Sequence, residues 1–189
     1  MARSIHHIIG FNKKRKHMNF KQKITGIKAF IFDIDGVLSS TIISVNTEGL
    51  QRTIYSKDSY AIQYAIKKGY KIAIITGGKG EHLIKCYQSL GIKDIYINSG
   101  IKKVAFHDFL NKHNLTKDEV LYMGDDIPDY EVMSECGVAV CPLDASHEIK
   151  SISMYISDKK GGYGCVRDII EQVLKSQNQW FDTDIAYEW

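Results

Sequence analysis

The sequence predicts an α/β fold, in which a mostly parallel, doubly wound β-sheet carries helices on both faces. From residue 24 onward, short apolar runs alternate with segments of helical periodicity, which is typical of a parallel sheet flanked by helices. The length of 189 residues suits a single domain with one buried core. The segment 38–57 interrupts the alternation, so the sequence predicts this fold with one insertion after the first strand.

Six apolar runs are expected to form the strands of the sheet. They are KAFIFD (28–33), YKIAIIT (70–76), DIYIN (94–98), VLYMG (120–124), VAVC (138–141) and MYIS (154–157). The amphipathic segments between them predict helices over 59–68, 81–90, 102–113, 128–135, 145–152 and 165–175. Signals for helix ends support these limits: Gly69, Gly91 and Gly137 as stops, Pro128 in a first turn, and a capping box of Thr116 with Glu119.

The interrupting segment predicts a β-hairpin. Its central part, STIISVNTEGLQRTIYS, contains two β-rich runs joined at residues 46–49 by turn-forming residues. Such a pattern is typical of two antiparallel strands connected by a tight turn. The hairpin is therefore expected over 38–57, directly after the first strand of the sheet.

Composition and charge exclude several classes of protein. Hydrophobic residues make up 44% and charged residues 25% of the chain, and no apolar run approaches the ~20 residues that span a bilayer. The start of the chain lacks the long apolar stretch of a signal peptide. We therefore expect a cytoplasmic protein without a membrane partner. The four cysteines form no CxxC pair, so buried free thiols are expected: Cys86, Cys136, Cys141 and Cys165.

The net charge of +3 is unevenly distributed. Residues 1–23 carry seven lysine or arginine residues and no acid, which leaves 18 basic against 22 acidic residues in the remainder. We interpret 1–23 as a basic, flexible extension, 24–176 as the domain, and 177–189 as an aromatic tail that is either disordered or docked on a neighbour. A basic run at 13–16 is more often solvated than a nucleic-acid site, so no nucleic-acid partner is expected. Met18 is an alternative start.

Polar residues at the ends of the expected strands carry the chemistry. Ligands of open parallel sheets bind beyond the carboxyl ends of the strands. Asp33 and Asp35 end the first strand, Thr76 with Gly77 ends the second, and Lys102 begins the helix after the third. The fourth strand runs into Asp125, Asp126 and Asp129. Each signal alone is weak, but together they predict one site.

The acids in this set indicate a magnesium-dependent phosphatase. Bringing Asp33, Asp35 and Asp125 together is unfavourable without a cation, and an all-oxygen set suits Mg²⁺. Asp33 can attack phosphorus in line. Asp35 can protonate the leaving oxygen and then take a proton from the hydrolytic water. Thr76 and Lys102 can hold the phosphoryl oxygens as charge moves.

The motifs DxD, Thr-Gly, lysine and GDDxxD resemble those of the haloacid dehalogenase-like phosphohydrolases over residues 27–175. The resemblance implies that Asp33 is the nucleophile and a metal ligand, and that Asp35 is the general acid/base and gives its backbone carbonyl to Mg²⁺. It implies Asp125 as the third metal ligand and Asp126 and Asp129 as residues that orient metal waters or Lys102. Neither usual insertion point has room for the cap domain of that superfamily, so we expect a hairpin in its place.

Further stretches resemble the 3-deoxy-D-manno-octulosonate 8-phosphate phosphatase family, which acts in lipopolysaccharide precursor synthesis. They are KDSYAI after the hairpin, LGIKDIY, VLYMGDDIPDYEVM and GGYGCVRDIIEQVL. The resemblance implies a homotetramer in which the hairpin covers a neighbour's active site. A glycine-rich loop with Arg167 suits a phosphorylated sugar acid. The residues expected to bind this substrate are Gly77, Gly78, Lys79, Arg52, Lys57, Lys85 and Arg167.

Two alternatives remain open at this point. Many relatives have an arginine directly after the Thr-Gly pair, where this chain has Gly78, and a basic residue where it has Cys86. The substrate is therefore either the eight-carbon sugar acid phosphate or a nine-carbon keto sugar acid 9-phosphate. A receiver-type signalling domain is the remote alternative, which the placement of both acids of DxD on one strand disfavours.

Overall fold

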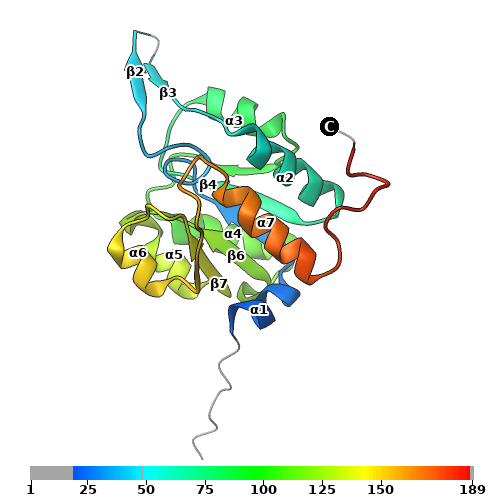
Figure 1. Ribbon diagram of the computed structural model, residues 1–189. Coiled ribbons are helices and arrows are strands. Elements are labelled where there is room, and N and C mark those ends of the chain that lie inside the picture. The colour runs from blue at the N-terminus through cyan, green and yellow to red at the C-terminus, as the bar shows by residue number, and fades with distance from the viewer. Residues whose placement is uncertain (1–18, 48, 188–189) are drawn as a thin grey trace, which may run out of the picture.

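A six-stranded parallel sheet forms the centre of the molecule (Figure 1). The structure is a computed structural model that describes residues 19–47 and 49–187. The strand order is β5-β4-β1-β6-β7-β8, and all neighbours pair in parallel. The six predicted strands are confirmed, with these bounds: β1 (Ala29–Phe32), β4 (Lys71–Ile75), β5 (Asp94–Tyr96), β6 (Val120–Met123), β7 (Val138–Cys141) and β8 (Tyr155–Ile156).

The strand order fixes where a ligand can bind. The chain starts in the middle of the sheet at β1, extends to β4 and β5 on one side, and then crosses to β6, β7 and β8 on the other. This is the 3-2-1-4-5-6 order of a Rossmann-type sheet, whereas receiver domains have the order 2-1-3-4-5. The crevice at the reversal of order lies beyond the carboxyl ends of β1 and its neighbours.

Helices cover both faces of the sheet, as the alternating pattern predicted. The apolar cluster that contains Phe30 and Phe32 of β1 also contains residues of α2, α3 and α7, and the cluster that contains Ala29 and Ile31 also contains residues of α4, α5 and α6. The helices are α1 (Phe20–Lys23), η1 (Ile24–Gly26), α2 (Ser56–Lys67), α3 (Glu81–Gln88), α4 (Lys102–His113), η2 (Lys117–Glu119), η3 (Ile127–Asp129), α5 (Tyr130–Glu135), α6 (His147–Ile152) and α7 (Cys165–Ser176).

Three details of the predicted helices differ from the structure. The segment expected as one helix over 128–135 divides into the short turn η3 and the helix α5. The capping box of Thr116 and Glu119 is present, but it caps the short 3₁₀ turn η2 before β6. Helix α2 begins at Ser56, three residues before the expected start.

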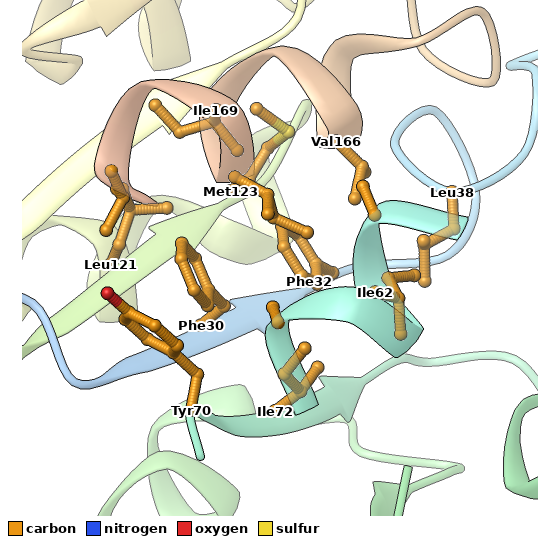
Figure 2. Packing of buried hydrophobic residues seen from close by; sticks show 14 of the residues in the cluster. Phe30, Phe32, Leu38, Ile62, Tyr70, Ile72, Leu121, Met123, Val166 and Ile169 are labelled. Carbon is orange, nitrogen blue, oxygen red and sulfur yellow. The ribbon is translucent and has the colours of Figure 1, made fainter. Parts of the chain in front are cut away.

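The central strand β1 is buried along its whole length. Its four side chains have no exposed surface, and they point alternately to the two faces because strand side chains have a period of two. Figure 2 shows Phe30 and Phe32 between α2 and α7, in one apolar cluster with Leu121 and Met123 of β6 and Val166 and Ile169 of α7. Such packing holds the carboxyl end of β1 rigidly, so the residue after it, Asp33, has a fixed position.

The predicted hairpin is confirmed. Strands β2 (Ser44–Asn46) and β3 (Gly49–Gln51) pair antiparallel, with Val45 beside Leu50. The hairpin projects from the domain (Figure 1). Its large apolar side chains, and those that flank it, are exposed: Ile42 by 81%, Val45 by 76%, Leu50 by 51% and Ile54 by 47%.

The described parts of the two terminal segments pack on the domain. Residues 1–18, most of the expected basic extension, lie outside the described residues, but Phe20 stacks on Tyr155 with ring centroids 4.7 Å apart. Beyond α7, the chain folds back along α2, where the Tyr60 hydroxyl donates a 2.5 Å hydrogen bond to the Ala186 carbonyl. The four cysteines are free thiols. Among the described residues, no helix has the length and apolar character that crossing a membrane requires.

Candidate active site

Four strand ends bring the predicted residues to one edge of the sheet. Asp33 follows β1, Thr76 follows β4 and Asp125 lies two residues after β6. The parallel register sets Phe32 beside both Ile74 of β4 and Met123 of β6, so the three strands end at the same level. Lys102 begins α4 after β5 and is buried, with 5% of its surface exposed. The site predicted from four separate segments is therefore one physical site.

A buried lysine joins two of the acids. Lys102 Nζ lies 2.9 Å from Asp33 Oδ2 and 2.7 Å from Asp129 Oδ1. The hydroxyl of Tyr122, on β6, donates a 2.7 Å hydrogen bond to the same Asp129 oxygen, and the Asp125 amide donates to Asp129 Oδ2 at 3.3 Å. Asp129 thus contacts Lys102 directly; its expected role in orienting metal waters or Lys102 stays a prediction. Tyr122 was not predicted, because its position inside an apolar strand carries no polar signal.

Three carboxylates in this site can hold a metal ion. Oxygen atoms of Asp33, Asp125 and Asp129 all lie within 4.8 Å of one another. The buried Asp33 Oδ1 has no hydrogen-bond partner among the described residues, and such an atom is costly unless a ligand satisfies it. An all-oxygen set of acids suits a hard cation such as Mg²⁺. The residues present therefore fit the metal that the sequence predicts.

The backbone after β1 leaves room for these acids only because residue 36 is glycine. Gly36 has a φ of +82°, and a Cβ atom added there would lie 1.9 Å from Asp125 Oδ2. A side chain at this position would displace Asp125 and strain the backbone. The Asp-Gly pair of FDIDG is thus a packing requirement of the site.

Without a cation, the crowded acids resist ionisation. Burial, and next the Asp129 charge, raise the pKa of Asp33 from 3.8 to about 7, although Lys102 opposes the shift. Burial, followed by the charges of Asp33 and Asp129, raises the pKa of Asp125 to about 8. A bound cation would favour both ionised forms.

The raised pKa values predict how stability depends on pH. Between about pH 4 and pH 8 the folded protein retains protons on Asp33 and Asp125 that the unfolded chain releases, so their contribution to stability falls as the pH rises through this range. We expect the Tm of the metal-free protein to be lower at pH 8 than at pH 5 by about 5 °C or more. Because Mg²⁺ binds ionised carboxylates, it should raise Tm more at pH 8.

Calorimetry of the metal-free wild-type protein and of Asp125→Asn checks this prediction. The variant removes one raised pKa and should show a flatter dependence of Tm on pH. If Tm changes equally with pH in the two proteins, the raised pKa of Asp125 does not cause the pH dependence of stability.

Asp35 lies at the mouth of the site and faces the hairpin. It lines a cavity of about 340 Å³ together with Asp33, Gly36, Thr41, Asp125, Asp126, Pro128 and Asp129. Its carboxylate accepts hydrogen bonds from Arg52 Nε at 2.6 Å and from Arg52 Nη2 at 2.9 Å. Arg52, which we predicted to bind the substrate carboxylate, is therefore engaged by Asp35 in this structure.

The loop after β4 carries Thr76 and three of the residues expected to bind substrate. Thr76 is buried, and its hydroxyl accepts a 3.0 Å hydrogen bond from the Gly78 amide, while Gly77 and Lys79 are exposed. This conformation positions Thr76 beside the end of β1. The predicted roles of Gly77, Gly78 and Lys79 in substrate binding stay predictions.

Three of the predicted substrate-binding residues do not contact the acids. Lys57 and Lys85 are exposed. Arg167 pairs with Glu171 at 2.6 Å and lies over the rings of Tyr60 and Trp180, with distances of 5.6 Å and 5.4 Å to their centroids. Arg167 lines a separate cavity of about 230 Å³ beside the C-terminal segment. To bind an anion of the substrate, Arg167 would have to release Glu171 and move away from the two aromatic rings.

The glycine-rich loop that contains Gly161 and Gly162 packs against the backbone that follows β1. A Cβ atom added to Gly161 would lie 1.8 Å from the Gly36 carbonyl oxygen, and the Gly162 amide donates a 2.8 Å hydrogen bond to the Val37 carbonyl. We predicted that these glycines allow a close approach to a ligand. In the structure they allow the close approach of the loop to the segment that carries Asp35.

The fold and the acidic site define this chain as a haloacid dehalogenase-like hydrolase. Residues 94–169, which include Lys102, Asp125 and Asp129, match the family model described as haloacid dehalogenase-like hydrolase. The 3-deoxy-D-manno-octulosonate 8-phosphate phosphatase of Yersinia pestis is 31% identical over 159 residues, which cover 84% of this chain and 85% of that protein. The chain belongs to the family of 3-deoxy-D-manno-octulosonate 8-phosphate phosphatases, and it is a phosphatase.

Solved structures agree with this assignment. The 3-deoxy-D-manno-octulosonate 8-phosphate phosphatase of Moraxella catarrhalis, in complex with a magnesium ion, a phosphate ion and a KDO molecule, is 34% identical with a TM-score of 0.82; the match covers 88% of this chain and 95% of that one. The cobalt-bound form of the Haemophilus influenzae phosphatase is 25% identical with a TM-score of 0.83 and coverage of 88% and 99%.

Proposed function

We propose that the protein is a Mg²⁺-dependent phosphatase that hydrolyses 3-deoxy-D-manno-octulosonate 8-phosphate to the free sugar acid and phosphate. The observation that carries the proposal is the state of Asp33. One of its oxygens is held by Lys102 at 2.9 Å, and the other is buried without a partner among the described residues. A fixed carboxylate with one unengaged oxygen, at the end of a rigid strand, is suited to attack phosphorus in line.

Each neighbouring residue has a role in this reaction. Asp33 attacks the phosphorus atom and forms an aspartyl phosphate, while Asp35 donates a proton to the leaving sugar oxygen. Asp35 then accepts a proton from the water that cleaves the aspartyl phosphate. Lys102 and the Thr76 hydroxyl offset the negative charge of the phosphoryl oxygens. Asp129 and Tyr122 keep Lys102 in place, with contacts of 2.7 Å each at Asp129 Oδ1.

Mg²⁺ would complete the charge balance of the site. The carboxylates of Asp33 and Asp125 and the backbone carbonyl of Asp35 would hold the ion, with Asp126 and Asp129 beside it. When bound, the ion supplies positive charge to a phosphoryl group that three acids would otherwise repel. The relatives with bound magnesium or cobalt support this part of the proposal.

The choice of substrate rests on the relatives. Proteins named for this substrate are 31% and 34% identical over most of their length. The nine-carbon keto sugar acid 9-phosphate stays as the second candidate, because Gly78 and Cys86 occupy positions where many relatives carry basic residues. The Rossmann-type strand order and the phosphatase relatives argue against the receiver-type alternative.

Phosphate release from a panel of substrates tests the proposal. The panel contains the eight-carbon acid phosphate, the nine-carbon acid phosphate and ordinary sugar phosphates without a carboxylate, each with and without Mg²⁺. We expect kcat/KM for the eight-carbon substrate to exceed that for the others by at least about tenfold. A higher kcat/KM for the nine-carbon substrate would favour the alternative function. Equal rates of phosphate release with and without Mg²⁺ would contradict the proposed dependence on the metal.

We also propose that the enzyme is a homotetramer with shared active sites. The exposed apolar side chains Ile42, Val45, Leu50 and Ile54 on and beside the hairpin are typical of an interaction surface, and a second copy of this chain is the proposed occupant. Light scattering measures the mass in solution. A monodisperse monomer with full activity would contradict this proposal.

A further inference from the structure

Arg52 carries a largely covered side chain on an otherwise exposed segment. It follows β3 directly, at the base of the projecting hairpin (Figure 1). Only 8% of its side chain is exposed, whereas its neighbours Gln51 and Thr53 are exposed. Arginine side chains are seldom buried without a specific partner. The side chain of Arg52 is therefore directed to a defined place in the site.

That place is the carboxylate of Asp35. Arg52 Nε lies 2.6 Å from Asp35 Oδ1, and Nη2 lies 2.9 Å from Oδ2. Two parallel charge-assisted hydrogen bonds fix both the distance and the plane of a carboxylate. The Ser39 hydroxyl adds a weaker hydrogen bond of 3.3 Å to Oδ1. Arg52 is thus the principal constraint on the orientation of Asp35.

This arrangement disfavours a role for Arg52 as the receptor of the substrate carboxylate. To bind an anion of the substrate in the same bidentate way, Arg52 would have to release both Asp35 oxygens. The Asp35 side chain, which is 33% exposed, would then keep only the Ser39 contact. A base that takes a proton from the hydrolytic water must be held in a defined place, so this release would harm the step that Asp35 performs.

We propose that Arg52 is a positioning residue, which holds the Asp35 carboxylate in the orientation required to accept a proton from the hydrolytic water and links the hairpin to the reacting centre. The proposal rests on the proposed function of the site. It explains why the side chain of an arginine beside a surface hairpin is largely covered and lies against an acid of the active site. It also gives the hairpin a role within its own subunit, in addition to any contact with a second copy.

Kinetics of Arg52→Gln test the proposal with a sugar phosphate and Mg²⁺. If Arg52 positions Asp35, kcat should fall about 10- to 100-fold, because a small misplacement of a catalytic group is costly. KM should stay within about threefold of the wild-type value, because Arg52 does not touch the substrate. Arg52→Lys should recover part of the loss, since lysine restores the charge but not the planar fork. Thr53→Ala, an exposed neighbour, should behave as the wild type.

Hydrogen exchange of the hairpin gives a second readout that does not depend on turnover. The amides of 44–51 should exchange faster in Arg52→Gln and also in Asp35→Asn, since either change breaks the same pair. Thr53→Ala should leave their exchange unchanged.

Three outcomes would overturn the inference. A rise in KM with unchanged kcat would make Arg52 a substrate ligand. If an active Arg52→Gln variant has unchanged kcat and KM, Arg52 does not position Asp35 for the reaction. If hydrogen exchange of the hairpin amides is unchanged in this variant, the pair with Asp35 does not link the hairpin to the site. A wild-type protein that releases no phosphate from any monoester would instead overturn the proposed function itself, so the two failures are distinguishable.

Discussion

Replacing Asp33 by asparagine is expected to lower kcat for phosphate release by about 10⁴-fold or more. The amide has nearly the same shape as the carboxylate, so it can occupy the same buried position at the end of β1. It cannot attack phosphorus, and it loses the ion pair that Lys102 makes with Asp33 Oδ2 at 2.9 Å. Phosphate release from the preferred sugar phosphate, with saturating Mg²⁺, measures the effect.

Two controls make this result specific. Asp158→Asn changes an acid whose side chain is 74% exposed and whose ion pair is with Lys159, and it should retain full activity. The Tm of metal-free Asp33→Asn should not be lower than that of the wild type near pH 8, because a carboxylate crowded by Asp125 and Asp129 has been removed. Turnover by Asp33→Asn within tenfold of the wild type would exclude Asp33 as the nucleophile.

The fold could be predicted from the sequence because the segments with an apolar strand pattern are also the segments that are buried in the sheet. The strands of the sheet are short and mainly apolar, and all lie within the runs that the sequence predicted. The strand β1 is buried on both faces, so its residues Ala29 to Phe32 are apolar without interruption. The hairpin was recognisable because its turn residues separate two β-rich runs.

The reacting residues could be predicted for a topological reason. In a doubly wound sheet, the residues that follow parallel strands meet at one edge. Asp33, Thr76 and Asp125 hold such positions, and Lys102 begins a helix beside them. The meeting of these residues could therefore be predicted from the strand ends, whereas their roles in the reaction stay proposals.

The partners of the arginines could not be predicted in this way. Arg52, which directly follows β3, lies against Asp35, and that contact depends on tertiary packing. Arg167 lies against Tyr60 and Trp180 because the C-terminal segment folds back along α2. The sequence shows an arginine and several aromatic residues, but it does not show which of them meet.

The second large effect is expected for Asp35→Asn, and it differs in kind from that of Asp33→Asn. With p-nitrophenyl phosphate, the leaving group departs without a proton donor, so Asp33 can still form the aspartyl phosphate. Without the Asp35 carboxylate, no base activates the water that hydrolyses this intermediate, and that step should slow by about 10²- to 10⁴-fold. We expect a burst of p-nitrophenolate that approaches one equivalent per site, followed by a nearly stalled reaction.

Rapid-mixing kinetics with three variants separate the roles of the residues in the site. Asp33→Asn should give no burst, because it forms no aspartyl phosphate. Arg52→Gln keeps the Asp35 carboxylate but loses its two hydrogen bonds of 2.6 Å and 2.9 Å, so it should turn over slowly without a lasting stall. Asp35→Asn alone should trap the phosphoryl group on the peptide that contains Asp33, which mass spectrometry of the quenched protein would detect. If Asp35→Asn instead turns over a sugar phosphate at the wild-type rate, the proton must be transferred by another group, and the pair of Asp35 with Arg52 would have no part in the reaction.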